Sequence, residues 1–367
     1  MKILITGIAG FIGNALALHL ARRGHSVAGI DNINAYYDPR LKIARLRRAG
    51  FPTGNLPCVR VTPWSGRRRA EVEVADFPYG VTYRSETYSE LTFTRIDITD
   101  LRCLEDFYSR GQFDTVIHLA AQAGVRYSIE NPLLYVNTNV VGFTNLLECA
   151  RKAKTPHFIY ASSSSVYGDN ADVPFSESDR VDSQASLYAA TKKCDEVIAS
   201  TYSRLYGMTT TGLRFFTVYG PWGRPDMAPS LFADAILDGR PIDVFNNGDM
   251  TRDFTYIDDI VEGVAAVVEK GAKMSGNSLY NIGCGHPERL GEFIRLLEQA
   301  LGKRAALNML PMQTGDVPQT WADTTAFRRD FGMTPGISLS EGIGRFARWR
   351  LSAGGCPENF DKIVNID

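Results

Sequence analysis

The feature of the sequence that most constrains its fold is an alternation of short apolar runs, rich in β-branched residues, with longer segments of helical periodicity. This alternation is typical of βαβ units, in which successive strands lie parallel in one sheet. The runs expected to be strands are Lys2–Thr6, Ser26–Ile30, Leu91–Ile96, Thr115–Leu119, His157–Ala161 and Thr209–Phe215. The segments expected to be helices are Ile12–Arg23, Leu101–Ser109, Pro132–Lys152 and Leu187–Leu205. Together they predict an α/β protein with a Rossmann-type doubly wound parallel sheet.

The regular alternation ends near Thr217, after which prolines at close intervals punctuate shorter segments. We therefore expect a Rossmann domain in residues 1–216 and a smaller C-terminal α/β substrate domain in residues 217–367. A helix at about residues 258–270 is expected to return to the first domain.

Residues 51–90 interrupt the pattern at a point where a βαβ unit needs only a short connection. The segment has no lysine but carries the run Arg67-Arg68-Arg69. We interpret it as a surface insertion, and the alternative is a flap that binds an anion.

The charge balance argues against several classes of partner. Lys and Arg number 40 against 41 Asp and Glu, so no basic field is present to hold nucleic acid or a membrane surface. The six cysteines lie far apart, with no metal-ligand spacing, and the first apolar run is too short for a signal peptide. We expect a cytoplasmic protein with reduced thiols, no metal site, and neither nucleic-acid nor membrane partners.

Three glycines follow the first expected strand and open the first expected helix, in the motif TGIAGFIG. Backbone N–H groups at such a helix start can face a pyrophosphate that no Cβ obstructs. Asp31 follows the second strand, where a carboxylate can bind ribose hydroxyls and repels a 2′-phosphate, which favours NAD over NADP. The cofactor-binding residues predicted here are Gly7, Gly10, Phe11, Ile12, Gly13, Asp31, Asn32, Asn34, Asp97 and Ile98.

A tyrosine and a lysine lie four residues apart on one expected helix, as Tyr188 and Lys192. A second group, the serine run that begins at Ser162, follows the fifth strand, where a parallel strand delivers side chains to the ligand crevice. A phenol with an ordinary pKa near ~10 is a poor base at neutral pH unless nearby positive charge stabilises its phenolate. The pattern indicates a tyrosine that takes a proton from a substrate hydroxyl.

The motifs TGIAGFIG, YASSSSVYG and YAATK together resemble those of the extended short-chain dehydrogenase/reductase family, the NAD-dependent epimerases and dehydratases. The segments DNINAYYD, HLAAQAGVRYSIENP and RFFTVYGPWGRPDMA resemble those of UDP-glucuronate 4-epimerases. The resemblance covers nearly the whole chain apart from residues 51–90. It implies an NAD cofactor, a UDP-sugar substrate and a homodimer formed through Pro132–Lys152 and Leu187–Leu205.

The resemblance also implies roles for individual residues. Ser163, Tyr188 and Lys192 match the catalytic residues, and the last two also match nicotinamide-side contacts. Further cofactor-side matches are Leu119, Ala120, Ala121 and Asn139. The expected substrate-binding residues are Ser163, Ser164, Thr217, Arg224, Val244, Arg252 and Asp316.

Among the substrate-side positions, Thr217 stands where UDP-galactose 4-epimerases have asparagine, and the smaller side chain leaves room for a C6 carboxylate. Arg224 is a second candidate for the carboxylate, unless it is a solvated loop arginine. Arg252 is expected to grip the diphosphate, whereas Val244 and Asp316 border the uracil and ribose. Gln313 replaces an arginine of the UDP-galactose enzymes, which puts one phosphate contact in doubt.

Three reactions share this scaffold, and each begins by oxidation of the sugar at C4. Dehydratases carry an acid pair where this chain has Ser164 and Ser165, and UDP-glucuronate decarboxylases carry a glutamate at the second position. The prediction is therefore 4-epimerisation of UDP-glucuronate through a 4-keto intermediate, with Ser163, Ser164, Thr217 and Arg224 fixing the carboxylate so that it is retained. The alternatives are a UDP-glucose/galactose 4-epimerase and a non-catalytic NAD-sensing Rossmann protein.

Overall fold

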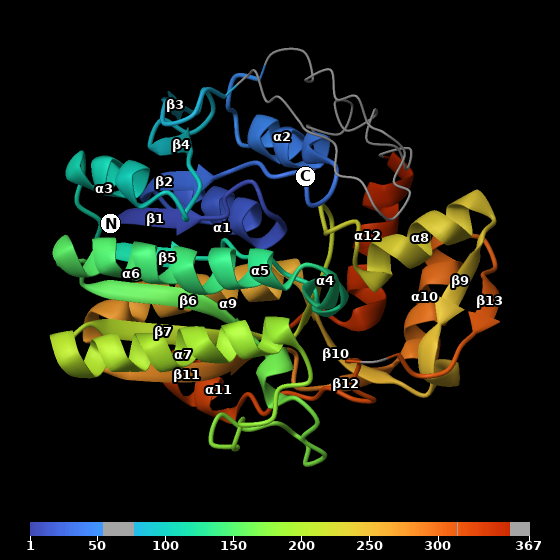
Figure 1. Ribbon diagram of the computed structural model, residues 1–367. Coiled ribbons are helices and arrows are strands. Elements are labelled where there is room, and N and C mark those ends of the chain that lie inside the picture. Colours follow the sequence, from blue (N-terminus) through green and yellow to red (C-terminus); the bar gives the residue numbers. More distant parts are fainter. Residues whose placement is uncertain (54–76, 314, 353–367) are drawn as a thin grey trace.

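The computed structural model describes residues 1–53, 77–313 and 315–352. Its centre is an eight-stranded sheet in the order β11-β7-β6-β5-β1-β2-β4-β3, in which only the β3–β4 pair is antiparallel. The strands are β1 (Lys2–Thr6), β2 (Ser26–Asp31), β3 (Thr82–Arg84), β4 (Leu91–Arg95), β5 (Thr115–His118), β6 (His157–Ser163), β7 (Thr209–Phe215) and β11 (Asn277–Ile282). All six predicted strands are present, and the Rossmann-type doubly wound α/β fold is confirmed (Figure 1).

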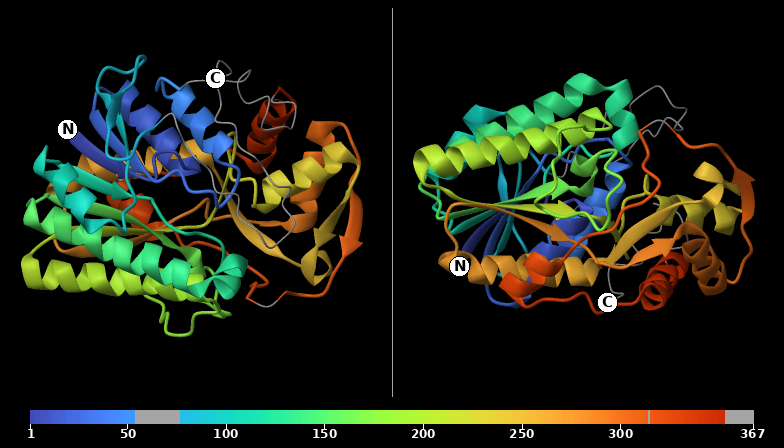
Figure 2. Two further views of the ribbon diagram at one scale, coloured as in Figure 1. Left: turned by 45° about the horizontal axis from the view of Figure 1, so that its top comes forward. Right: turned by 90° about the horizontal axis from the view of Figure 1, so that it is seen from below.

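Helices cover both faces of this sheet, so the larger part of the molecule has three layers (Figure 2). One face packs against α3 (Leu101–Ser109), α6 (Gly142–Lys152) and α7 (Leu187–Tyr206), and the other against α1 (Phe11–Arg22) and α9 (Ile257–Lys270). The short helices α2 (Pro39–Arg48) and α4 (Val125–Glu130) follow the ends of β2 and β5, and α5 (Pro132–Tyr135) follows α4. Since β1 connects to β2 on one side and neighbours β5 on the other, the strand order reverses at β1, and ligands bind at such a switch point.

The helix predicted over Pro132–Lys152 is continuous in path but not in hydrogen bonding. A π-helical segment, η1 (Val136–Val141), separates α5 from α6. Segments of this kind are rare and occur frequently at functional sites. Sequence periodicity does not reveal them, because the apolar spacing is hardly altered by one wide turn.

The smaller part contains two additional sheets. One has the order β12-β10-β8, and the other pairs β13 with β9. The strands are β8 (Thr217–Tyr219), β9 (Pro241–Val244), β10 (Thr251–Tyr256), β12 (Pro287–Arg289) and β13 (Ala306–Met309). The helices are α8 (Ala228–Asp238), α10 (Leu290–Leu301) and α12 (Leu339–Ser352), with a short 3-10 turn at η3 (Phe245–Gly248). A second such turn, η4 (Gly271–Lys273), follows α9 in the larger part and lies against β6.

The C-terminal half is not confined to the smaller part. Strand β11, from residues assigned to the substrate domain by sequence, pairs in parallel with β7 at the edge of the large sheet. Helix α9 packs on α1, and α11 (Thr325–Phe331) packs on α9. One apolar core runs through both parts, because the chain passes between them more than once.

The end of the 51–90 segment adds to the large sheet. Thr82 pairs with Thr94 in the antiparallel β3–β4 register, so β3 becomes its edge strand. The run Arg67-Arg68-Arg69, on which the anion-flap alternative depends, lies outside the described residues. None of the helices within the described ranges is both long enough and apolar enough to span a bilayer.

Candidate active site

The glycine-rich turn between β1 and α1 allows a ligand to approach the backbone closely. Gly7 has a φ of +76°, and α1 begins at Phe11 and Ile12, directly after Gly10. A Cβ at Gly13 would lie only 2.2 Å from the carbonyl oxygen of Gly7. The N–H groups at the start of a helix attract a negatively charged group. This cradle fits the pyrophosphate of the predicted dinucleotide.

The loops after β2 and β4 are joined by a hydrogen bond at the carboxyl ends of these strands, where adenosine is expected. The Asp31 carboxylate accepts N–H groups from Ala9 at 3.2 Å and from Ile33 at 2.8 Å. Asn32 Nδ2 donates to Asp97 Oδ2 at 2.8 Å. Because a carboxylate oxygen accepts more than one hydrogen bond, Asp31 keeps capacity for a ribose hydroxyl.

Two other residues predicted on the adenosine side, Asn34 and Ile98, make contacts inside the protein. Asn34 Oδ1 accepts from Lys42 Nζ at 2.9 Å and from the Tyr36 N–H at 3.2 Å. Ile98 is buried, and a Cβ at Gly142 would lie 2.7 Å from its Cδ1. Their contact with the cofactor stays a prediction.

The segment Leu119–Ala121 follows β5 and lies against the end of β1. The N–H groups of Leu119 and Ala120 donate to Thr6 Oγ1 at 3.2 and 3.0 Å. A Cβ at Gly7 would lie 2.9 Å from the Ala120 nitrogen. The loop expected beside the nicotinamide is therefore in contact with the pyrophosphate turn.

Asn139, in the π-helical segment, joins this loop to α7. Its Oδ1 accepts the Gln122 N–H at 2.8 Å, and its Nδ2 donates to the Gln122 carbonyl at 2.9 Å and to Thr191 Oγ1 at 3.0 Å. The Thr191 hydroxyl in turn donates to the carbonyl of Tyr188 at 2.8 Å. Asn139 is fully buried and fixes the backbone that carries Tyr188.

The serine run at the end of β6 divides into two roles. Ser162 Oγ donates to the buried carboxylate of Glu196 at 2.7 Å, which makes Ser162 structural. Ser163 caps the 3-10 turn η2 (Ser164–Tyr167), where its Oγ accepts the Ser165 N–H at 3.2 Å. Ser163 and Ser164 thus lie at the carboxyl end of β6, where the fold places ligands.

Helix α7 brings the predicted tyrosine and lysine to the serine turn. The helix is capped by Ser186 and packs against both β6 and η2. The ring of Tyr188 lies 6.2 Å from that of Tyr135, at an interplanar angle of 79°. Lys192 Nζ donates to Asp195 Oδ2 at 3.1 Å, and both side chains are buried.

Arg224, predicted to bind a carboxylate, lies in a partly buried ion pair. Its Nε and Nη2 donate to the two oxygens of Asp226 at 3.0 and 2.5 Å. Tyr36 Oη donates to the same carboxylate at 3.0 Å. The Arg224 guanidinium is therefore held in one orientation and is not free in solvent.

Thr217, the other residue predicted to lie near the C6 carboxylate, begins β8. It is half-buried, and Phe254 is its partner in the parallel register.

Arg252, on β10, is bound to a loop of the smaller part. Its Nη1 donates to the carbonyl of Pro318 at 3.1 Å, and its Nη2 donates to that of Val317 at 2.8 Å. Burial lowers the pKa of the Arg252 guanidinium. A group that is already desolvated in this way is suited to a charged ligand such as a diphosphate.

The residues expected near uracil and ribose are connected through an arginine of the larger part. Arg126, on α4, lies 3.2 Å from Asp316 and stacks over the ring of Phe245 at 4.9 Å. Val244 is only 2% exposed, and its carbonyl accepts the Leu310 N–H at 2.9 Å, so its contact with a ligand stays a prediction. Gln313 Oε1 is buried and has no hydrogen-bond partner in the described parts of the chain.

Sequence reasoning did not single out several of these residues. Tyr36, Arg126 and Asp226 lie within motifs used for the resemblance, but nothing in their spacing indicates that Tyr36 contacts Asp226 or that Arg126 contacts Asp316. The contact of Asp195 with Lys192 could have been predicted from the sequence, because residues three apart on a helix are neighbours. Its burial, which decides its effect, comes from packing against the sheet.

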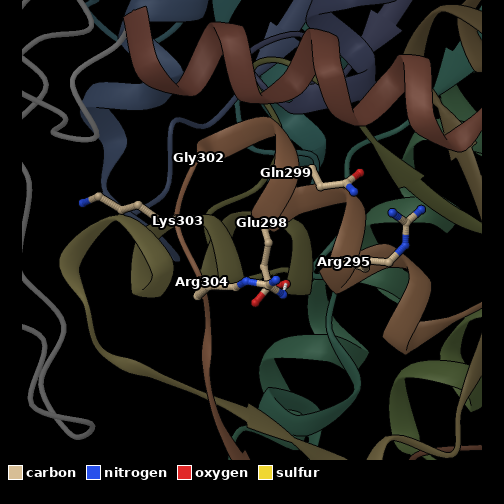
Figure 3. Close-up of a pocket in the computed structure, with 6 residues that line it drawn as sticks. All are labelled: Arg295, Glu298, Gln299, Gly302, Lys303 and Arg304. Carbon is tan, nitrogen blue, oxygen red and sulfur yellow. Dashed lines mark hydrogen bonds and ion pairs between the residues drawn. The ribbon is translucent and has the colours of Figure 1, made fainter.

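A surface hollow on the smaller part, shown in Figure 3, contains none of the predicted site residues. Its charged side chains already have partners: Arg295 binds Glu292, Arg304 binds Glu298, and Lys303 Nζ donates to the Leu237 carbonyl. We assign it no role in binding.

The glycine turn, the acidic edge and the helix beside the serine turn define a Rossmann-fold protein built to hold a dinucleotide next to a tyrosine. The model of the NAD dependent epimerase/dehydratase family matches residues 3–283. The chain therefore belongs to this family.

Individual relatives match over almost the whole chain. Protein CapI of Staphylococcus aureus is 44% identical over 366 residues, covering 96% of this chain and 98% of the relative. UDP-glucuronate 4-epimerase 4 of Arabidopsis thaliana is 43% identical, covering 96% and 76%. A solved structure of UDP-glucuronic acid 4-epimerase from Bacillus cereus, in complex with UDP-glucuronic acid and NAD, has a TM-score of 0.80 at 32% identity, covering 95% and 98%.

Proposed function

We propose that this protein is a UDP-glucuronate 4-epimerase, which interconverts UDP-glucuronate and UDP-galacturonate with NAD as its resident cofactor. The observation that carries the proposal is the packing of the Tyr188/Lys192 helix against a serine turn that has hydroxyls, and no carboxylate, at Ser164 and Ser165. Elimination and decarboxylation by relatives of this kind use carboxylic acids at those places, whereas epimerisation does not. The relatives named above support the same reaction.

The residues that fit NAD come from two strand ends and from helix α7. The glycine turn after β1 would hold the pyrophosphate, Asp31 at the end of β2 would accept from the adenosine ribose, and Lys192 on α7 would donate to the nicotinamide ribose. Bound NAD supplies the hydride acceptor, and later the hydride donor, for carbon 4 of the sugar. Net oxidation over one turnover is zero, so the protein needs no second redox partner.

Tyr188 performs the proton transfer. Its phenolate takes the proton of the C4 hydroxyl while Ser163 donates a hydrogen bond to the same oxygen, and the ammonium of Lys192 stabilises the negative charge on the phenol. Once the keto sugar has turned over in the site, so that carbon 4 can be reduced on its opposite face, Tyr188 returns the proton to the C4 oxygen. The hydrogen bonds from Asn139 to the Thr191 hydroxyl, and from that hydroxyl to the Tyr188 carbonyl, fix the backbone that carries the phenol in both steps.

Retention of the carboxylate follows from its fixed orientation. A 4-keto-6-carboxylate loses carbon dioxide most easily when the bond to the carboxylate is perpendicular to the ketone plane. Hydroxyls of Ser163, Ser164 and Thr217, together with the oriented guanidinium of Arg224, hold the group away from that geometry.

The direct test is incubation of the purified protein with UDP-glucuronate and no added cofactor, followed by identification of the sugar product. UDP-galacturonate is the expected product. Conversion of UDP-glucose to UDP-galactose alone would favour the neutral-hexose alternative. A substantial yield of UDP-pentose would contradict the retention of the carboxylate.

Replacing Arg224 by leucine should raise KM for UDP-glucuronate by about tenfold or more, because a hydrogen bond to a charged group contributes ~1.5–3 kcal/mol. Steady-state kinetics with UDP-glucuronate and UDP-glucose measure the effect. The control is Arg240→Leu, which removes an exposed ion pair with Asp238 far from the site. An equal rise in KM for both substrates would mean that Arg224 does not bind the carboxylate.

We also propose a homodimer that forms through one helical face. This face is formed by α4, α5, η1 and α7, which expose large apolar side chains. Leu133 is 82% and Leu205 is 64% exposed. Exposed apolar groups that cluster in this way are typical of interfaces, and a twofold axis pairs one patch with itself. The group also includes Ile129, Val136, Val141, Val197 and Tyr206. Light scattering should give a mass twice that of the 40.6 kDa chain, and a monomeric mass at micromolar concentration would contradict the proposal.

A cytoplasmic location completes the proposal. The cysteines in the described part of the chain, Cys103, Cys149, Cys194 and Cys284, are free thiols, as is usual in a reducing compartment.

A further inference from the structure

Helix α7, which carries Tyr188 in its first turn, also carries two adjacent carboxylates, and both are buried. Asp195 is 0% and Glu196 is 2% exposed. A buried carboxylate is costly unless a positive group or hydrogen bonds compensate it. The partners of the two groups therefore define what each one does.

Glu196 is occupied by other elements of the fold. Both of its oxygens accept from the guanidinium of Arg214, at 2.8 and 2.9 Å, and one also accepts from Ser162. Lys193 adds a longer contact of 3.6 Å. Glu196 thus forms a complete ion pair without Lys192.

Asp195 is left as the counter-ion of Lys192. Its Oδ2 accepts from Lys192 Nζ at 3.1 Å, and Lys192 is only 2% exposed. Its Oδ1 is buried and has no hydrogen-bond partner in the described residues. An ammonium group carries three N–H donors, so two remain for other groups at the site.

The other titratable groups around this pair are held neutral. Burial, and the charge of Lys192, keep the pKa of His118 on β5 well below its usual range. Burial, and the charges of Glu196 and Asp195, raise the pKa of Tyr160 on β6 well above its usual range. Burial, together with Asp195, also raises the pKa of the Cys194 thiol on α7. Apart from the Arg214–Glu196 pair, the charge balance under Tyr188 rests on Lys192 and Asp195.

We propose that Asp195 is a positioning residue: as the buried counter-ion 3.1 Å from Lys192 Nζ, it holds the ammonium of Lys192 in place and thereby sets the alkaline limit of activity. The inference deepens the proposed function, in which Lys192 binds the nicotinamide ribose and stabilises the phenolate. Asp195 acts through Lys192 and does not touch the substrate.

The pH dependence has a definite sign. Burial raises the pKa of the Asp195 carboxyl to about 7, although the adjacent ammonium of Lys192 acts in the opposite direction. Below that pH the group is mainly neutral, and an asparagine then has nearly the same shape and charge. Above it the carboxylate is ionised, and only the aspartate offers a counter-ion. The wild type and Asp195→Asn should therefore behave alike at pH 6 and differ at pH 9.

The test compares these two proteins between pH 5.5 and 9.5 by two measurements. The alkaline limb of kcat/KM for the UDP-sugar should move down by about one pH unit or more in Asp195→Asn, since removal of an opposite charge within hydrogen-bond distance has an effect of that size. The affinity of the NAD-free protein for NAD, measured by titration, should weaken at pH 9 but not at pH 6. The second measurement needs no sugar, so it stands even if the substrate differs from UDP-glucuronate.

Two further variants complete the design. Lys193→Gln removes the neighbouring cation on the same helix and should leave both pH profiles unchanged. Asp195→Ala, which also lacks the charge, should shift the alkaline limb like Asp195→Asn and replaces it if the asparagine variant does not fold. Coincident profiles of wild type and variant, or a loss that is the same at pH 6 and pH 9, would overturn the proposal.

Discussion

Replacing Tyr188 by phenylalanine should reduce turnover of UDP-glucuronate by ~10²- to 10⁴-fold, the range that a positioned acid–base group contributes. The change removes only the phenolic oxygen, and the ring keeps its contact with Tyr135. The backbone of this residue is fixed separately through Thr191 and Asn139, so the helix should not move. We therefore expect the variant to fold and to retain its NAD.

The measurement is product formation at saturating UDP-glucuronate, with NAD content and UDP-sugar affinity determined on the same preparation. Tyr206→Phe is the matched control, because Tyr206 lies at the opposite end of the same helix and the change keeps the ring that belongs to the proposed dimer face. It should have wild-type turnover. Undiminished activity of Tyr188→Phe would remove this phenol from the mechanism.

The second large effect concerns stability. Replacing Arg214 by methionine should lower the free energy of unfolding by about 3–5 kcal/mol, as expected when one partner of a buried ion pair is removed. Arg214 is 1% and Glu196 is 2% exposed, so Glu196 would keep a buried charge without its two strong hydrogen bonds. Arg214 Nη1 also donates to Tyr167 Oη at 3.0 Å, which links the pair to the serine turn.

Urea denaturation followed by circular dichroism measures the loss. Arg295→Met is the control, since Arg295 and its partner Glu292 are both exposed on α10, and its removal should change the stability little. A small effect of Arg214→Met would mean that Glu196 becomes protonated or hydrated at little cost. In that case the pair would not be what holds α7 to the sheet.

The predicted strands and long helices agree with the structure because both depend on local patterns. A buried parallel strand needs a run of apolar residues, and a covering helix needs an apolar face, whatever their neighbours are. The glycine turn was equally readable, because the absence of a Cβ at Gly7 and Gly13 is itself the property that the fold requires. These features survive in any tertiary arrangement that keeps the sheet.

Two strands of the large sheet, β3 and β11, could not be predicted from local sequence patterns. Strand β3 has three residues, and β11 comes from a half of the chain that the sequence assigns to the substrate domain. Their membership is decided by edges of the sheet that become available only after the other strands have paired. Local sequence carries little information about such a choice.

At the site, the residues that carry chemistry can be recognised from the chain alone: the glycines, the acid after the second strand, the serine run and the Tyr188/Lys192 spacing. Each is a chemical identity placed at a strand or helix end, and the chain order fixes it. Which positive group compensates each buried carboxylate, in contrast, depends on the packing of distant segments. Asp195 and Glu196 are adjacent and chemically alike, yet one receives an arginine from β7 and the other receives the lysine of the catalytic pair. The reason is that the arginine comes from a strand distant in the sequence, and that the burial of both pairs arises from packing of α7 against the sheet, which no local pattern encodes.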